Sequence, residues 1–120
     1  MKSVVALFSS VVVMVSLLGC NSGGGAGGGS SAALPDCPTG GTDLTYDNFG
    51  KAFFSSYCDS CHAGSQKPSL GTAAEIASWA DQIYAQAGDG NSSMPPGNAS
   101  AQPSVDERSN LAEWLACGAP

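Results

Sequence analysis

Apolar residues recur at three- and four-residue spacing in the first helical segment of this chain, between about residues 46 and 58. The stripe follows a candidate N-cap at Thr45 and consists of Phe49, Ala52, Phe53 and Tyr57. This spacing places apolar side chains on one face of an α-helix, and a threonine hydroxyl at the N-cap binds an unpaired amide of the first turn. The pattern therefore predicts an amphipathic helix that begins near residue 46.

Two further helices are predicted by capping signals that precede the same spacing. Thr72 and Glu75 have the capping-box pattern, and the stripe that follows runs to Gly88 and contains Ile76, Trp79, Ala80, Ile83, Tyr84 and Ala87. Ser104 and Glu107 repeat the pattern before Leu111, Trp114 and Leu115. Residues 89–103 are rich in Gly, Asn, Ser and Pro and predict a loop. Strand patterns are absent, so we expect an all-α domain of about three helices, with these aromatic residues in its core: Phe53, Phe54, Tyr57, Trp79 and Tyr84.

The first 19 residues predict a cleaved lipoprotein signal peptide. Lys2 provides a positive start, and residues 4–18 form an apolar run of signal-peptide length that is short for a membrane-spanning helix. The run ends at Leu18-Gly19-Cys20, which is similar to the lipobox of bacterial lipoproteins, in which the cysteine carries the lipid. An ordinary signal peptide or a short anchor, with Cys20 incidental, is the alternative.

Residues 20–34 are predicted to form a tether, and residues 35–120 a single folded domain. Residues 21–31 are almost entirely Gly and Ser, and a coil of this length spans on the order of 15–20 Å. With a lipid on Cys20, the tether would hold the domain close to a bacterial membrane. Asn21 after the cysteine resembles a signal for outer-membrane sorting, so we expect an exported protein on that membrane, facing the periplasm or the cell surface.

The charge of the chain is acidic, with a net charge of −6 at pH 7. After cleavage, three cations (Lys51, Lys67 and Arg108) face ten carboxylates. Nucleic-acid binding requires a basic surface, so this balance argues against it. An acidic surface favours protein partners with basic docking surfaces, or serves only to keep the protein soluble.

Cys58, Cys61 and His62 form a CxxCH pattern that contains the only histidine of the chain. Each thiol can form a thioether with a vinyl group of haem, and the histidine offers a nitrogen to the iron. Because a second histidine is lacking, Met94 is the predicted sixth ligand; Met1 and Met14 both fall in the predicted signal. A bare CxxC also occurs in thioredoxin-like redox pairs, which need a βαβ context, and in zinc sites, which need a fourth ligand.

Cys37 and Cys117 remain, one near each end of the predicted domain. Export permits disulfides, and a bond between these two cysteines would close a long loop and stabilise the domain by about 2–4 kcal/mol. We expect the disulfide, and two free thiols are the alternative.

With its flanking residues, the CxxCH segment resembles class I c-type cytochromes. Gly50 and Phe54 precede it at that family's spacing, and Trp114 matches the aromatic position of the family's last helix. The resemblance implies that Gly50 lets the first helix cross close to the last helix, against Trp114.

The same resemblance extends to the segments that follow the histidine. Pro68 and Leu70 match the family's Pro-x-Leu segment, and Met94-Pro95-Pro96 resembles its methionine-ligand loop. The likeness implies that the Pro68 carbonyl accepts a hydrogen bond from the second ring nitrogen of His62. We expect Pro68, Leu70, Gly50, Phe54 and Trp114 to pack around the cofactor or support its ligands.

The resemblance implies a cytochrome c-like fold around one covalent haem c. The expected function is electron transfer between redox protein partners by a membrane-tethered carrier, with no small-molecule substrate and no catalysis of its own. One alternative is a haem-based gas or ligand binder with a labile or absent Met94 bond. Another is an electron-donating subunit of a redox enzyme complex. A free-standing enzyme is disfavoured because the only histidine is used at the iron.

Overall fold

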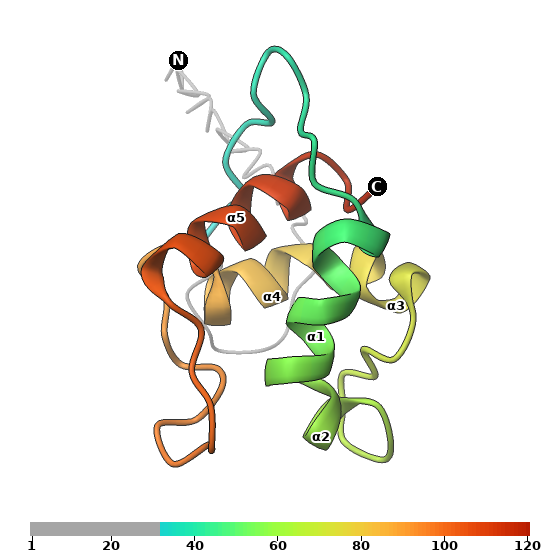
Figure 1. Ribbon diagram of the computed structural model, residues 1–120, viewed down its shortest axis with the longest axis vertical. Helices are drawn as coiled ribbons and strands as arrows, with labels where there is room; N and C mark the ends of the chain where they lie inside the picture. The colour runs from blue at the N-terminus through green and yellow to red at the C-terminus, as the bar shows by residue number, and fades with distance from the viewer. Residues whose placement is uncertain (1–31) are drawn as a thin grey trace, which may run out of the picture.

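The computed structural model describes residues 32–120 and confirms an all-α fold over that range (Figure 1). Its elements are the π-helical turn η1 (Tyr46–Gly50) and the helices α1 (Lys51–Tyr57), α2 (Asp59–His62), α3 (Ala73–Ser78), α4 (Ala80–Ala87) and α5 (Val105–Ala116). The predicted signal peptide, Cys20 and residues 21–31 of the predicted tether lie outside the described residues. None of the helices within residues 32–120 has the length and apolar character needed to cross a membrane.

Thr45 caps the first helical segment, as predicted. Its hydroxyl accepts a hydrogen bond from the Asn48 amide at 3.1 Å, and the Asn48 side chain accepts one from the Thr45 amide at 2.7 Å. The pair is a capping box in which Asn48 takes the place that Glu or Gln usually holds. The helix continues through η1 and α1 and is interrupted at Cys58, where φ is −122° and ψ is −41°. The short helix α2, which was not predicted, begins after this interruption.

The predicted second helix is divided into two. Thr72 accepts a hydrogen bond from the Glu75 amide at the start of α3, but the backbone leaves the helical conformation at Trp79, where φ is −112° and ψ is 14°. Because this break changes where the following side chains point, Trp79 does not share the stripe of Ile76 and Ile83. Those two side chains are buried, whereas Trp79 is 38% exposed. The prediction of Trp79 as a core residue is therefore wrong.

Helix α5 begins and buries its apolar face as predicted. Ser104 and Glu107 form the expected capping box, and the side chains of Leu111, Trp114 and Leu115 are almost completely buried. Arg108 lies on the buried side of the same helix, with only 6% of its surface exposed. This buried cation was not predicted.

The hydrophobic core is formed by side chains of α1, α3, α4 and α5. Figure 1 shows α5 above α1 and alongside α4, which runs in the opposite direction. A Cβ atom on Gly50 would lie 2.7 Å from two ring carbons of Trp114, far closer than an ordinary carbon–carbon contact. The glycine therefore lets the start of the first helical segment approach α5 at a distance that no side chain would permit.

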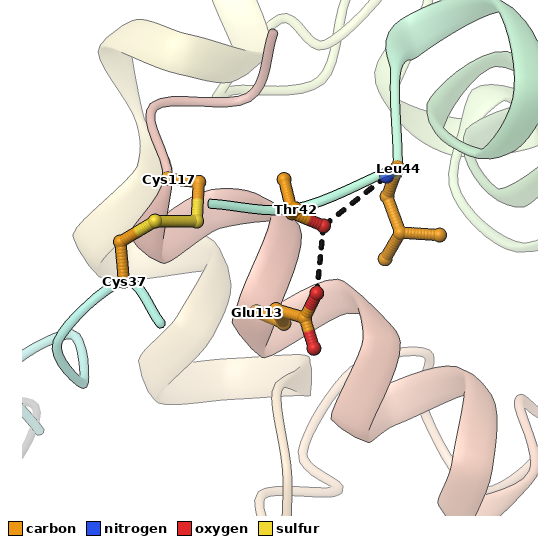
Figure 2. The surroundings of a disulfide bond; sticks show 5 residues. All are labelled: Cys37, Thr42, Leu44, Glu113 and Cys117. Carbon is orange, nitrogen blue, oxygen red and sulfur yellow. Dashed lines mark hydrogen bonds between the residues drawn. A yellow bond between two sulfur atoms is a disulfide. The ribbon is translucent and has the colours of Figure 1, made fainter. Parts of the chain in front are cut away.

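A disulfide joins Cys37 to Cys117, which are 80 residues apart in sequence (Figure 2). Beside it, the Thr42 hydroxyl donates to the Glu113 carboxylate at 2.7 Å and accepts from the Leu44 amide at 3.1 Å. The segment before η1 is thereby tied to the last turns of α5. In Figure 1 this segment lies at the top of the domain, whereas α2 lies at the opposite end of α1.

Candidate functional site

Cys58, Cys61 and His62 lie on one short turn. The amides of Cys61 and His62 both donate to the Cys58 carbonyl, at 3.1 and 2.9 Å. Residues three and four positions apart share one face of a helical turn. All three line one cavity of about 240 Å³. The turn therefore presents two sulfur atoms and one imidazole to a common space.

The walls of this cavity are mostly apolar and come from separate parts of the chain. They include Phe53 of α1, Leu70 of the segment after α2, Ile83 and Ala87 of α4, and Pro95 and Pro96 of the loop between α4 and α5. Figure 1 shows α2 and this orange loop at the lower end of the domain, apart from each other. A group bound at this site would be surrounded by apolar side chains. Residues of α2 and residues of the loop between α4 and α5 would both reach it.

His62 is held by the segment that follows α2. Its Nδ1 lies 2.8 Å from the Pro68 carbonyl oxygen, and its own carbonyl accepts a hydrogen bond from the Leu70 amide at 2.9 Å. A carbonyl oxygen can only accept, so Nδ1 is the donor, and in the neutral ring Nε2 then carries the lone pair. The ring is thus oriented by one nitrogen and leaves the other ready to bind a metal.

Met94 reaches the same cavity from the loop between α4 and α5. Its amide donates to the Gln86 carbonyl at 2.9 Å, and its carbonyl accepts from Nη1 of Arg108, also at 2.9 Å. Its side chain is 40% exposed. Met94 is the only methionine among residues 32–120, and it lines a cavity that His62 also lines.

The two free cysteines of the described chain differ in their surroundings. Cys61 is exposed, whereas Cys58 is partly buried. Burial, with a smaller contribution from the Asp59 carboxylate, raises the pKa of the Cys58 thiol to about 12, although the Arg108 cation acts in the opposite direction. Thioredoxin-like redox pairs need a βαβ context, and the elements of residues 32–120 are all helical.

The family model described as cytochrome C oxidase, cbb3-type, subunit III, matches residues 48–115, which is more than half of the chain. The chain belongs to this family of c-type cytochromes. It is therefore an electron-transfer cytochrome that binds haem c covalently. Searches of curated proteins and of solved structures found no match.

The residues around the cavity of this cytochrome fit haem c. The group needs two thiols for its vinyl carbons, a nitrogen ligand for the iron and an apolar enclosure, and residues of the cavity lining supply each of these. Of the residues predicted to pack around the cofactor, Pro68 and Leu70 line the cavity. Gly50, Phe54 and Trp114 do not line it; they meet where η1 and α1 pack against α5. Phe53, the neighbour of Phe54, faces the cavity instead.

Sequence reasoning missed two polar residues of the cytochrome that contact the backbone of the methionine loop, Arg108 and Gln102. Arg108 donates to the carbonyl of Met94 and to the carbonyls of Ala87 and Asn91. A signal was present in the sequence, because Arg108 lies three positions before Leu111 and seven before Leu115, on the apolar stripe of α5. A cation on such a stripe indicates a buried charge with a specific set of partners.

Proposed function

We propose that this protein is a membrane-tethered, single-haem electron carrier in which His62 and Met94 are the two axial ligands of the iron. The supporting observation is that these residues line one apolar cavity, with Nε2 of His62 left free by the hydrogen bond from Nδ1 to Pro68. In this proposal, Cys58 and Cys61 each add a thiol across one vinyl group. A sulfur–carbon bond forms in each case, and the thiol proton passes to the neighbouring vinyl carbon.

The ligand set explains electron transfer without substrate chemistry. When bound, haem c supplies one iron atom that alternates between the ferric and ferrous states. His62 and Met94 would together fill both axial positions, so no position stays open for oxygen or a substrate. The soft thioether of Met94 favours the ferrous state and raises the reduction potential. The protein would accept one electron from a reduced redox protein and pass it to an oxidised one.

The tether and the location follow from the sequence of residues 1–34. We propose that Cys20 carries the lipid and that the Gly/Ser-rich residues after it let the domain reorient near a bacterial membrane. The outer membrane, facing the periplasm or the cell surface, is the proposed location. The acidic charge of the chain favours redox partners with basic docking surfaces.

A haem-based ligand binder is the second candidate, and the 40% exposure of the Met94 side chain favours it. A weak methionine bond would open one axial position to a diatomic gas. The description of the family model as an oxidase subunit favours a third role, as an electron-donating subunit of a redox complex. The ligation of the iron separates the first two candidates.

The test is an absorption spectrum of the exported holoprotein, oxidised and reduced, beside the Met94→Ala and His62→Ala variants. We expect a low-spin haem c spectrum with the weak long-wavelength band of a methionine–iron bond, and loss of that band in Met94→Ala. The Met94→Ala protein should also have a lower reduction potential and bind carbon monoxide readily when ferrous. His62→Ala should not form stable holoprotein. Covalent haem without the band in the unaltered protein would support the ligand binder, and no covalent haem at all would overturn the proposal.

A further inference from the structure

We propose that Arg108 and Gln102 are positioning residues that hold Met94 at the iron by binding the backbone of its loop. This inference rests on the proposed Met94 ligation. Neither residue needs to touch the cofactor. Their role would be to restrict the loop to the conformation in which the thioether sulfur faces the cavity.

The two residues that follow Met94 have no amides with which to hold the loop. Met94 is followed by Pro95 and Pro96, and proline has no backbone N–H to donate. The backbone of residues 95 and 96 can therefore be fixed only through its carbonyl oxygens. The Ala99 amide donates to that of Pro96 at 2.8 Å, and the other donors must come from side chains. Met94 itself has its amide bound to the Gln86 carbonyl at 2.9 Å.

Arg108 and Gln102 supply those donors to three consecutive carbonyls. Nη1 of Arg108 donates to the Met94 carbonyl at 2.9 Å. Nε2 of Gln102 lies 3.4 Å from the Pro95 carbonyl oxygen and 2.8 Å from that of Pro96. The two side chains are linked, because Nη2 of Arg108 donates to Oε1 of Gln102 at 3.3 Å. The pair therefore forms one continuous network along the backbone of residues 94–96.

Arg108 also ties this network to the rest of the domain. Its Nη1 also lies 2.9 Å from the carbonyl oxygen of Ala87, at the end of α4, and 3.0 Å from that of Asn91, at the start of the loop. The two N–H groups of Nη1 are therefore shared among three carbonyls. Its own carbonyl accepts from the Asp89 amide at 3.0 Å. One side chain of α5 thus connects both halves of the loop to α4, which forms one wall of the cavity.

The burial of Arg108 indicates that these contacts are specific. Its side chain is 6% exposed, whereas Lys51 and Lys67, the other cations of the described residues, are exposed. Taking a cation out of water is costly unless its donors are satisfied, and both Nη1 and Nη2 of Arg108 meet uncharged oxygens. The guanidinium offers several donors in a rigid planar fork, which a lysine ammonium does not reproduce.

The experiment compares the exported holoproteins of Arg108→Met, Arg108→Lys and Gln102→Ala with the unaltered protein. Asn110→Ala, at an exposed position of the same helix, is the matched control. The readouts are the long-wavelength band of the ferric protein, the carbon monoxide affinity of the ferrous protein and the urea midpoint. Carbon monoxide competes with Met94, so its apparent affinity rises with the fraction of protein in which the methionine bond is open.

We expect Arg108→Met to raise the apparent carbon monoxide affinity by roughly ten- to a hundredfold, because the loop loses hydrogen bonds from a charged donor. Its long-wavelength band should be weakened or lost. Arg108→Lys and Gln102→Ala should give smaller changes in the same direction, and Asn110→Ala none. If Arg108→Met yields no holoprotein, Gln102→Ala is the test: a weaker band and a higher carbon monoxide affinity would support the proposal, and unaltered values would overturn it.

Met94→Ala separates failure of this inference from failure of the ligation on which it rests. If Met94→Ala leaves the band and the carbon monoxide affinity unchanged, Met94 is not the ligand and the proposed function is wrong. If Met94→Ala changes both, but the Arg108 and Gln102 variants keep the unaltered values, the positioning role is overturned. A lower urea midpoint alone, with the band and affinity retained, would show a merely structural role and would equally overturn it.

Discussion

The contact between Gly50 and Trp114 predicts that adding a single methyl group will destabilise the domain. In Gly50→Ala, the new Cβ would lie 2.7 Å from Cζ2 and Cη2 of Trp114 and 3.1 Å from Cδ2 of Tyr46. Ordinary carbon contacts are about 3.5–4.0 Å, so the two helices or the indole must move by the better part of an ångström. Trp114 has little freedom to do so, because it is fully buried and its Nε1 donates to the Pro120 carbonyl at 3.2 Å.

The expected net cost is about 2 kcal/mol. Overpacking a well-filled core costs about 1–3 kcal/mol, and this contact should fall at the upper end because two buried ring atoms are involved. Replacing glycine by alanine in a helix also stabilises the helix by up to about 1 kcal/mol, because alanine has the higher helix propensity. The difference leaves Gly50→Ala destabilised, which is opposite to the usual effect of this substitution in a helix.

A double-mutant cycle with Trp114→Phe tests the cause of this cost. Phenylalanine has no atoms that correspond to Cζ2 and Cη2, so it removes the clash while leaving an aromatic ring in the core. Trp114→Phe alone should be destabilising, because it leaves a cavity and loses the hydrogen bond to Pro120. The double variant should be more stable than the sum of the two single effects by about 1–3 kcal/mol, in the range of coupled neighbours.

The assay is urea unfolding of the holoproteins followed by circular dichroism, with Gly40→Ala as the matched control. A Cβ on Gly40 would have no atom within 4 Å, and its φ is not in the left-handed region. We expect the control to unfold at the same urea concentration as the unaltered protein or slightly above it. A Gly50→Ala variant as stable as the unaltered protein, or effects that add to within about 0.5 kcal/mol in the cycle, would refute the packing argument.

Three further outcomes are expected. Replacing Cys37 and Cys117 by serine should cost up to about 4 kcal/mol in urea, because the bond joins residues 80 positions apart; two reactive thiols in the denatured, unreduced holoprotein would contradict this disulfide. The Ser104 amide is the main cause that lowers the pKa of Glu107. The hydrogen bond from the Ser104 amide to the ionised Glu107 therefore stabilises the folded protein above the ordinary pKa of 4.5. This stabilisation is lost as the pH falls through the lower folded-state pKa. Glu107→Gln should make the free energy of unfolding depend less steeply on pH in this acid range. An unchanged pH dependence would show that Glu107 does not contribute. Cys20→Ser should move the protein from the membrane fraction to the soluble fraction, with Ser22→Ala as control; membrane retention of the serine variant would argue against lipidation.

Much of the fold could be predicted because its determinants are local. The capping residues Thr45 and Ser104 mark the starts of their helices through bonds to amides three residues away. The interruption at Trp79 could not be predicted in this way. The segment from 72 to 88 has a continuous helical pattern, and only the backbone conformation at Trp79 shows that the two halves of the stripe are not aligned.

The candidate site also has features that could be predicted from the sequence and features that could not. The CxxCH spacing indicates haem attachment by itself, because the two thiols and the imidazole lie within a single turn. The likeness to c-type cytochromes predicted a hydrogen bond between His62 and the Pro68 carbonyl, and the structure contains it. The role of Phe53, rather than Phe54, in the cavity wall could not be read from that likeness, since both residues fit the pattern of an aromatic before the haem motif.

The sequence by itself determined the helical class, the helix starts and the chemistry of the attachment turn, because each depends on residues a few positions apart. The tertiary structure brings Met94 and His62 to one cavity and places Trp114 against Gly50, as the likeness to c-type cytochromes led us to expect. It alone shows Arg108 enclosed between α5 and the methionine loop. These contacts join residues that are far apart in the chain. Spacing along a sequence carries no information about which distant groups will face one another, and that choice is made when the helices pack into a common core.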